Sequence, residues 1–162
     1  MNQYACAITG HRPTRFCFGY NEEDPLCQKL KECLLEQFGV DMWAGEQLLT
    51  LRAQTGYEDI KIIVVVPFIG YDSKWPDQSK HRLKKLIQNS NDSIVISHSA
   101  DVSSYKKRNY YMVDHAEYII GVFDNQKKLR SGTAQTVNYA LHQGKVITLI
   151  HPDTMEITAP AP

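Results

Sequence analysis

The sequence predicts one α/β domain of three layers, α/β/α, with a mainly parallel sheet of about five strands. The chain has 162 residues, of which 43% are hydrophobic, and this suffices for one core and leaves little for a second. Apolar β-branched segments alternate with segments of helical spacing along most of the chain. Such alternation is typical of a parallel sheet with helices on both faces.

The first half of the chain opens with a strand and continues with helices. A strand is predicted at residues 4–9, since this short apolar run stops at Gly10. A helix follows at residues 23–37, where Asp24 can cap the first turn and Pro25 fits inside it. A second helix is predicted from residue 41 to about residue 55, closed by Gly56.

The second half alternates regularly. Residues 60–66 are β-branched at nearly every position, as in a parallel strand covered on both faces. Further strands are predicted at residues 93–97, 118–123 and 145–150, and helices at residues 77–89, 103–115 and 133–142. Residues 157–162 are predicted to form a loose tail, so that the domain covers residues 1–156.

One feature of this pattern is irregular. Only Phe38, Gly39 and Val40 separate the first two predicted helices, where a doubly wound fold would have a strand. The sequence therefore predicts a sheet that lacks one usual strand after the first helix. Bare sheet edges favour pairing, so a homodimer that covers them is one expected partner arrangement.

The charges exclude some classes of protein. Lys and Arg total 18 and Asp and Glu total 18, which argues against a protein that coats nucleic acid by bulk charge. Residues 17–59 nevertheless carry three basic and nine acidic side chains, and residues 74–130 carry eleven basic and six acidic ones. We therefore expect two oppositely charged regions within a neutral total.

The sequence predicts a cytoplasmic protein with reduced cysteines and no metal site. The longest apolar stretch, residues 62–69, is less than half a membrane span, and no export signal opens the chain, so we expect a cytoplasmic protein. The four cysteines form no CxxC pair, which favours reduced thiols over a disulfide framework or a metal site. The histidines show no metal-ligand spacing, and no metal is expected.

Ligands of open α/β sheets bind beyond the carboxyl ends of the strands, so the residues there are the candidates for a site. Gly10, His11 and Arg12 follow the first strand and suit a phosphate or a carboxylate, although an exposed loop explains them too. Ser131, Gly132 and Thr133 begin a helix and suit an anion. Capping of the helix by Ser131 or Thr133 explains half of that pattern without any ligand.

Three further segments carry candidates. Gly39 permits close approach of a ligand, and Asp41 either accepts from a ribose or caps its helix. Trp43 either stacks on a base or packs in the core. Trp75 lies near Tyr71 and Lys74 in a loop that suits a base or covers the core edge, and Arg108 and Asn109 suit an anion and a sugar.

Five motifs occur in order: ITGHRP at residues 8–13, GVDMWAGE at 39–46, VPF at 66–68, RNYYMVDHA at 108–116 and SGTAQTVNYA at 131–140. Together they resemble the YpsA-like branch of the SLOG superfamily, named for the Smf/DprA and LOG proteins. The resemblance runs from about Tyr4 to Ile150 and implies a Rossmann-like fold with a site for a nucleotide or nucleotide derivative. The ligand-facing loops that it implies carry Gly10, His11, Arg12, Gly39, Asp41, Arg108, Asn109, Ser131, Gly132 and Thr133.

The sequence departs from this family pattern twice. Relatives have a strand and a GxAxGxD-like turn before the Asp-Met-Trp helix, and roughly 20 such residues are missing here. LOG-type phosphoribohydrolases carry GGxGTxxE, whereas Gly132 and Thr133 are followed by Ala134, Gln135 and Thr136. The glutamate of that motif is absent, which weakens the case for hydrolysis.

The leading functional hypothesis is binding or sensing of a nucleotide-derived ligand, such as ADP-ribose or an NAD-like molecule, by a regulatory protein. The alternative is hydrolysis of a nucleotide N-glycosidic bond, with Asp41 or Asp114 as weak catalytic candidates. The third is single-stranded nucleic-acid binding, with Tyr105, Tyr110 and Tyr111 as stacking groups. No cofactor beyond such a ligand and no membrane partner are expected.

Overall fold

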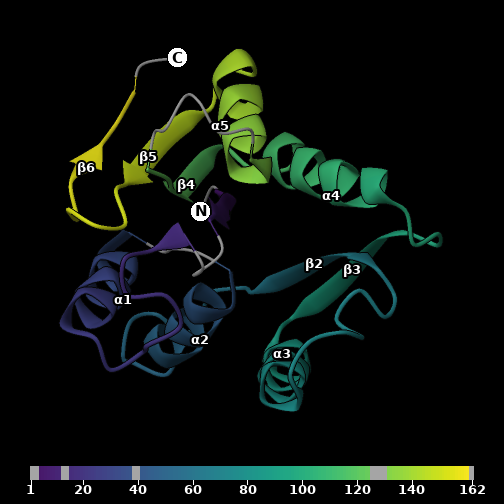
Figure 1. Cartoon of the computed structure of the whole chain (residues 1–162), viewed down its shortest axis with the longest axis horizontal. Coiled ribbons are helices and arrows are strands. Elements are labelled where there is room, and N and C mark those ends of the chain that lie inside the picture. The colour runs from purple at the N-terminus through teal and green to yellow at the C-terminus, as the bar shows by residue number, and fades with distance from the viewer. Residues whose placement is uncertain (1–3, 12–14, 38–40, 125–130, 161–162) are drawn as a thin grey trace.

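The computed structural model describes residues 4–11, 15–37, 41–124 and 131–160 (Figure 1). Every predicted helix and strand is present, with ends shifted by at most three residues. The helices are α1 (Pro25–Gln37), α2 (Asp41–Arg52), α3 (Asp77–Asn89), α4 (Val102–Asp114) and α5 (Gly132–His142). The strands are β1 (Cys6–Gly10), β2 (Ile63–Phe68), β3 (Asp92–Ser97), β4 (Tyr118–Val122), β5 (Val146–Ile150) and β6 (Ile157–Thr158).

The sheet is divided into two parts. One has the order β1-β4-β5-β6, and its first three strands are parallel. The other contains β2 and β3, which pair in parallel. Within the described residues no strand lies between α1 and α2, and none joins β1 to β2. The α/β fold with one strand lacking after the first helix is therefore confirmed.

Strand β6 lies in the segment predicted as a tail. Ile157 and Thr158 pair antiparallel with β5. The chain reverses just before them, where the amide of His151 donates to the carbonyl of Glu156 over 2.9 Å and Met155 has a φ of 59°. Met155 is buried in the core, which anchors this turn beside β5.

Alternate residues of β4 enter two separate core clusters. Ile120 and Val122 pack with Phe16, Phe18 and Trp43 on the side of α1 and α2. Ile119 packs on the other side, with residues of α4 and α5. The β1-β4-β5 part of the sheet is therefore covered on both faces, as predicted (Figure 1).

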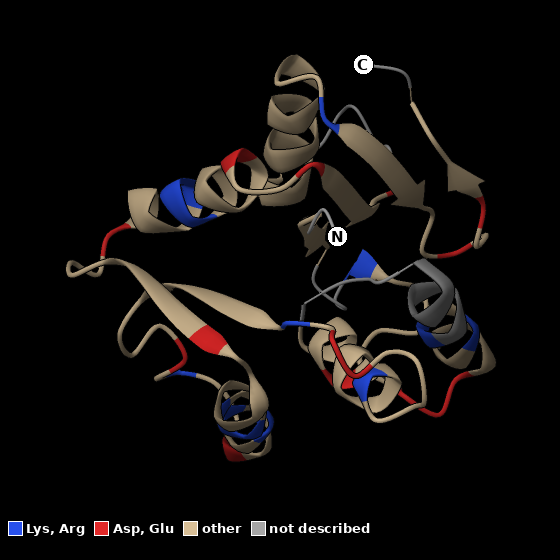
Figure 2. Cartoon of the chain, turned by 180° about the vertical axis from the view of Figure 1, so that it is seen from behind, with Lys and Arg blue, Asp and Glu red and all other residues tan. Residues whose placement is uncertain are grey.

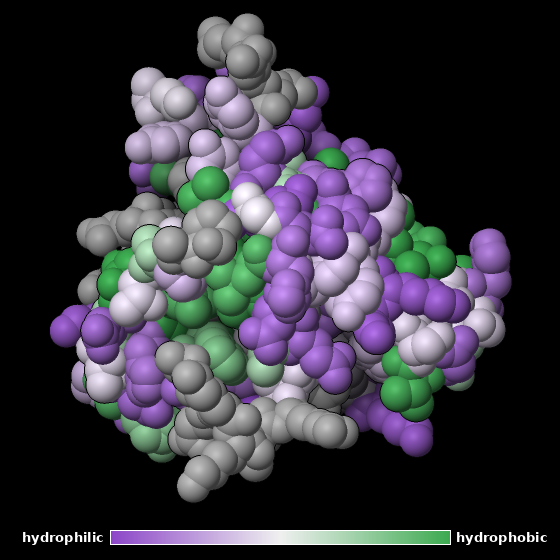
Figure 3. All heavy atoms as spheres, turned by 90° about the horizontal axis from the view of Figure 1, so that it is seen from above, coloured by the Kyte–Doolittle hydropathy of each residue, from purple (hydrophilic) through white to green (hydrophobic). Residues whose placement is uncertain are grey.

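The outer sides of α4 and α5 face solvent. Viewed from above, hydrophilic residues cover much of the middle of this face, with apolar side chains exposed to the left of centre (Figure 3). None of the described helices is long and apolar enough to cross a membrane.

The β2–β3 part is less well covered than its sequence predicts. Ile63 of β2 is 55% exposed and Val95 of β3 is 40% exposed. Complete burial of this β-branched strand was the expectation, and that expectation is wrong. Helices cover the faces of a parallel sheet, and α4 is the one helix that packs closely on β2 and β3 among the described residues, so the other face is less well covered. Strand β2 also has no neighbour on the side opposite β3 among these residues.

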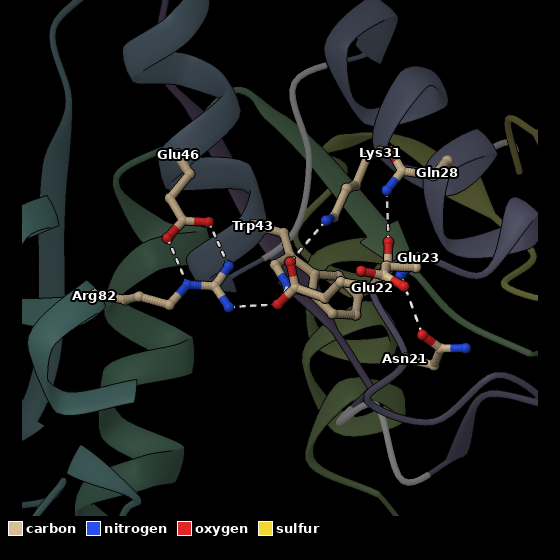
Figure 4. A network of polar contacts seen from close by, with 8 residues as sticks. All are labelled: Asn21, Glu22, Glu23, Gln28, Lys31, Trp43, Glu46 and Arg82. Atoms are coloured by element: carbon tan, nitrogen blue, oxygen red, sulfur yellow. Dashed lines mark hydrogen bonds and ion pairs between the residues drawn. The ribbon is translucent and has the colours of Figure 1, made fainter. Parts of the chain in front are cut away.

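Helix α3 is attached to the rest of the molecule through α2 and the loop before α1 (Figure 4). The guanidinium of Arg82 donates to both carboxylate oxygens of Glu46, with Nε–Oε1 2.7 Å and Nη2–Oε2 2.5 Å, and also to Glu22. Glu22 accepts in addition from Lys31 Nζ at 2.7 Å and from Trp43 Nε1 at 3.1 Å. One arginine thus joins three segments of the chain.

These contacts shift the pKa of Glu22. Its partial burial would raise the pKa, but hydrogen bonds from Lys31, Arg82 and Trp43 outweigh that effect and lower the pKa from 4.5 to about 2. The charged form is therefore favoured in the folded state. It stabilises the fold above pH 4.5, and this stabilisation is lost as the pH falls toward 2.

We predict that Arg82→Met lowers the free energy of unfolding by about 1–2 kcal/mol, because two half-buried carboxylates lose their shared donor. Chemical denaturation at neutral pH measures the loss. The stability of the variant should also decrease less than that of the wild type between pH 4.5 and 2, since the pKa of Glu22 rises without the guanidinium.

The matched control is Lys84→Met, which removes a charge from an exposed position of the same helix. It should change the free energy of unfolding by no more than about 0.5 kcal/mol. Equal losses in the two variants would contradict a specific role for the Arg82 contacts.

Candidate ligand site at the carboxyl ends of the strands

The loops after β1 and β4 begin side by side. Gly10 pairs with Val122 in the parallel register, and the amide of His11 donates to the carbonyl of Val122 over 3.1 Å. Parallel strands carry their carboxyl ends to one edge. His11 and Asp124 therefore meet there although 113 residues separate them in the sequence.

The His11 ring is fixed by two charged neighbours. Its Nε2 lies 3.0 Å from Asp124 Oδ1, and its Nδ1 lies 3.5 Å from Arg15 Nη1. A guanidinium only donates, so Nδ1 accepts and Nε2 carries the hydrogen that is donated to Asp124. Arg15 also donates to Asp124 Oδ2 at 3.3 Å. Both ring nitrogens are thus engaged within the protein, which favours a positioning role for His11.

Burial explains the protonation state of His11. The residue is 3% exposed and its ring packs against Phe123, with the centroids 5.2 Å apart. Burial lowers the pKa of His11 below 6.5, and the hydrogen bond and negative charge of Asp124 partly offset this effect. The positive charge of Arg15 lowers it further.

Helix α5 begins with the three predicted anion-binding residues. Ser131 caps the helix, with its Oγ accepting from the amide of Ala134 over 3.0 Å. Gly132 is exposed and Thr133 is buried. Amides in the first turn of a helix have no intrahelical acceptor, and the N-terminus carries a partial positive charge. The local geometry therefore suits an anion.

Helix α4 carries two predicted residues, and it brings Asn109 to this end of α5. A Cβ placed on Gly132 would lie 3.8 Å from the side-chain nitrogen Nδ2 of Asn109, so the two residues are neighbours. Arg108 precedes Asn109 and is half-buried. Its Nε is buried and has no hydrogen-bond partner within the described part of the chain. A buried donor without a partner is costly unless a ligand or water completes it.

Aromatic rings gather at the carboxyl end of β2. Phe68 ends that strand and contacts Tyr71 edge-on, with ring centroids 6.4 Å apart, and Tyr105 of α4 at 5.6 Å. Tyr71 in turn contacts Trp75 at 5.3 Å. Tyr105 lies one helical turn before Asn109. The same helix therefore reaches both the aromatic rings and the start of α5.

Other candidates lie elsewhere. Trp43 is 8% exposed, contacts Phe16 with ring centroids 6.3 Å apart and donates to Glu22, so the core-packing interpretation describes it. Asp114 ends α4, is exposed and accepts from the hydroxyl of Tyr139 over 2.8 Å, far along the helix from Arg108.

Three candidates cannot be located. Arg12 and Gly39 lie outside the described residues. Asp41 begins α2, and its side chain is likewise outside the described part of the chain.

Two residues of this edge were not among the sequence candidates. Arg15 and Asp124 hold His11 through contacts that join the loop after β1 to the end of β4. Asp124 directly follows a strand end, which is a signal that sequence reasoning can use. Arg15 had no comparable signal, because its partner is 109 residues away.

Comparison with known proteins decides the family. The family model YpsA, described as the YspA SLOG family, matches residues 35–155. The chain belongs to this family. The match covers β2 to β5 and all helices from α2 onward, and hence the start of α5 and the Arg108–Asn109 pair.

The relatives among curated proteins carry the name UPF0398. A UPF0398 protein of Staphylococcus epidermidis is 28% identical over 94 residues, which cover 57% of this chain and 49% of the relative. One from Staphylococcus haemolyticus is 27% identical over the same shares. The chain thus spans about half the length of these curated relatives. The UPF0398 protein YpsA of Bacillus subtilis is 25% identical over 152 residues, covering 80% of this chain and 83% of that one.

The match with the Bacillus subtilis member of the YpsA family also bears on the divided sheet. It runs over 152 positions, whereas 80% of this 162-residue chain is about 130 residues. About 20 positions of the relative therefore have no counterpart here, which equals a strand and a turn. The length difference agrees with the strand that the fold lacks.

We predict that the thermal midpoint of the protein falls as the pH is lowered from about 7.5 to about 5.5, and that His11 contributes to this fall. The unfolded histidine binds a proton near pH 6.5, before the buried one does, so acid favours unfolding. His11→Gln should flatten this dependence, as followed by circular dichroism.

The matched control is His142→Gln, at an exposed position near the end of α5. It should keep the wild-type dependence on pH. The same flattening in both variants would show that His11 does not cause it.

Proposed function

We propose that this member of the YpsA family binds a nucleotide or nucleotide-derived ligand, such as ADP-ribose or an NAD-like molecule, and acts as a sensor of it. Two observations carry the proposal: Asn109 lies near the exposed Gly132 at the start of α5, and the buried Nε of Arg108, the preceding residue of α4, has no partner among the described residues. Membership in a SLOG family supports the ligand class.

The phosphate end of the ligand would use donors from two helices. The amides of Gly132 and Thr133 and the side chains of Arg108 and Asn109 are hydrogen-bond donors, and the guanidinium adds a full positive charge. The next amide, of Ala134, is already taken by Ser131 Oγ. Gly132 supports this assignment because its missing side chain leaves the helix start open to a phosphate. A neutral ligand would gain less from these groups.

The base end would use the rings beside β2. Trp75 and Tyr71 are half-buried, so part of each ring is exposed to a base. Trp43 is a weaker choice, because it is packed in the core. The contact of Tyr105 with Phe68 and the proximity of Asn109 to Gly132 support one ligand spanning both ends along α4.

The two alternative functions receive less support. Hydrolysis through Asp114 would need that carboxylate to be available near the phosphate end. It lies at the C-terminal end of α4, six residues after Arg108, and accepts from the hydroxyl of Tyr139 in α5. Binding of single-stranded nucleic acid would need tyrosine rings that are free to stack on bases. The ring of Tyr110 instead stacks on that of Tyr139, with the centroids 3.8 Å apart, and Lys106 Nζ lies over the Tyr110 ring. Basic residues are also split between α3 and α4 (Figure 2).

We predict that Arg108→Met and Asn109→Ala each weaken binding of ADP-ribose, NAD or a mononucleotide by about 10- to 100-fold, the effect of losing one charged or polar contact to phosphate. Isothermal titration calorimetry of the whole chain against this panel measures it. Removal of Arg12 together with Arg108 should abolish binding.

The control is Lys107→Met, an exposed neighbour on the same helix, which should leave binding within about twofold. Absence of binding by the wild type to every member of the panel would refute the proposal. Unchanged binding by the Arg108 and Arg12 double variant would refute the phosphate assignment.

We predict that Trp75→Ala weakens binding of ADP-ribose by about 5- to 100-fold and leaves ribose 5-phosphate unaffected, because stacking on a base is worth about 1–3 kcal/mol. Trp75→Phe retains a ring and should bind close to the wild type. An equal loss for both ligands would place the tryptophan away from the base.

A further inference from the structure

Strand β1 has one side that no strand occupies within the described residues. On its other side, the carbonyl of Ala5 accepts from Tyr118, and the amide of His11 donates to Val122. Backbone groups of successive strand residues point to opposite sides. The N–H and C=O groups of Cys6, Ile8 and Gly10 therefore point away from β4.

Strand β2 has a similar but weaker edge. The carbonyl of Ile62 accepts from the amides of Asn91 and Asp92, so the groups of Ile63, Val65 and Pro67 point away from β3. Proline has no N–H to donate. The β2 edge therefore offers both a donor and an acceptor only at Ile63 and Val65, and β1 offers the longer edge.

The β1 edge lacks the protection that natural edge strands carry. Its sequence, Cys-Ala-Ile-Thr-Gly, contains no charge and no proline. Cys6 at its start is exposed and Ile8 is half-buried. Ile63 of β2, on the other side of the gap between β1 and β2, is 55% exposed.

Helices lie close to the gap between β1 and β2, and α4 extends across it. Helix α4 contacts β1, β2 and β3, and α2 contacts β1 as well as α3. A second folded copy would bring its own covering helices against α4 and α2, whereas a single extended segment needs only the width of one strand. The uncharged edges and apolar surroundings favour an uncharged, β-branched segment.

We propose that the free edge of β1 accepts an extended segment of another protein by β-augmentation. The segment would have about five residues, rich in valine, isoleucine and threonine and free of proline, to match the length of β1. Its backbone would pair with Cys6, Ile8 and Gly10. The inference rests on the divided sheet and is independent of the ligand proposed above.

Backbone hydrogen exchange of the whole chain, followed residue by residue by NMR, tests this proposal. In the chain alone, the amides of Cys6, Ile8 and Gly10 should exchange at least about 100-fold faster than those of Ala7 and Thr9, which face β4. The probe is the synthetic peptide Lys-Thr-Val-Ile-Val-Thr-Lys. Its addition should slow the three edge amides by about tenfold or more, with the chain remaining monomeric in sedimentation.

Two matched pairs make the test specific. The same peptide with proline in place of its central isoleucine should give no protection. Cys6→Pro removes one edge donor without removing a bond to β4 and should weaken the effect, whereas Cys6→Ser should not. The peptide pair gives an answer even where the Cys6→Pro variant fails to fold.

Three results would overturn the proposal. The first is slow exchange at Cys6, Ile8 and Gly10 in the monomer alone, equal to that of Ala7 and Thr9. The second is equal protection by the proline peptide. The third is a dimer in which these amides are protected before any peptide is added, which would assign the edge to a second copy of the chain.

Discussion

The parallel pairing of β1 with β4 is the constraint on which the rest of the structure depends. Its register sets Gly10 beside Val122, and the two following loops therefore start next to each other. The His11–Asp124 contact exists only in this register, because a slip of one residue would turn each side chain to the other face. The same strand β4 supplies residues to both core clusters, so the site and the core share one support.

Helix α4 connects the two parts of the sheet, which the lacking strand would otherwise join. No ladder connects β2 to β1 in the described residues, and the β2–β3 part is held instead by α4 and by the attachment of α3 to α2. Along α4, Tyr105 contacts Phe68 and, one turn later, Asn109 lies against Gly132. A continuous helix fixes these two contacts relative to each other. The distance between the aromatic rings and the start of α5 therefore depends on this helix.

Local signals explain which parts of the fold could be predicted from the sequence. Helix α3 has the predicted ends, and the missing strand was visible as three residues between two helices. The polar contacts could not be predicted, because Arg82 and Glu22 are 60 positions apart and meet only through tertiary packing. Trp43 shows the same limit, since its spacing suits both a base and a core, and only the neighbouring Phe16 decides.

Ion pairs within the molecule connect its acidic and basic regions, whose charges cancel in the neutral total. The acidic region, residues 17–59, and the basic region, residues 74–130, meet where Glu22 and Glu46 bind Arg82. Asp124, an acidic residue of the basic region, pairs with Arg15. Part of the opposite charge is therefore paired within the molecule. Among the described residues, Lys106, Lys107 and Arg108 form a basic segment of α4 next to Asn109. Such a local charge suits the one or two phosphates of a small ligand, whereas a polyanion would require a continuous basic surface.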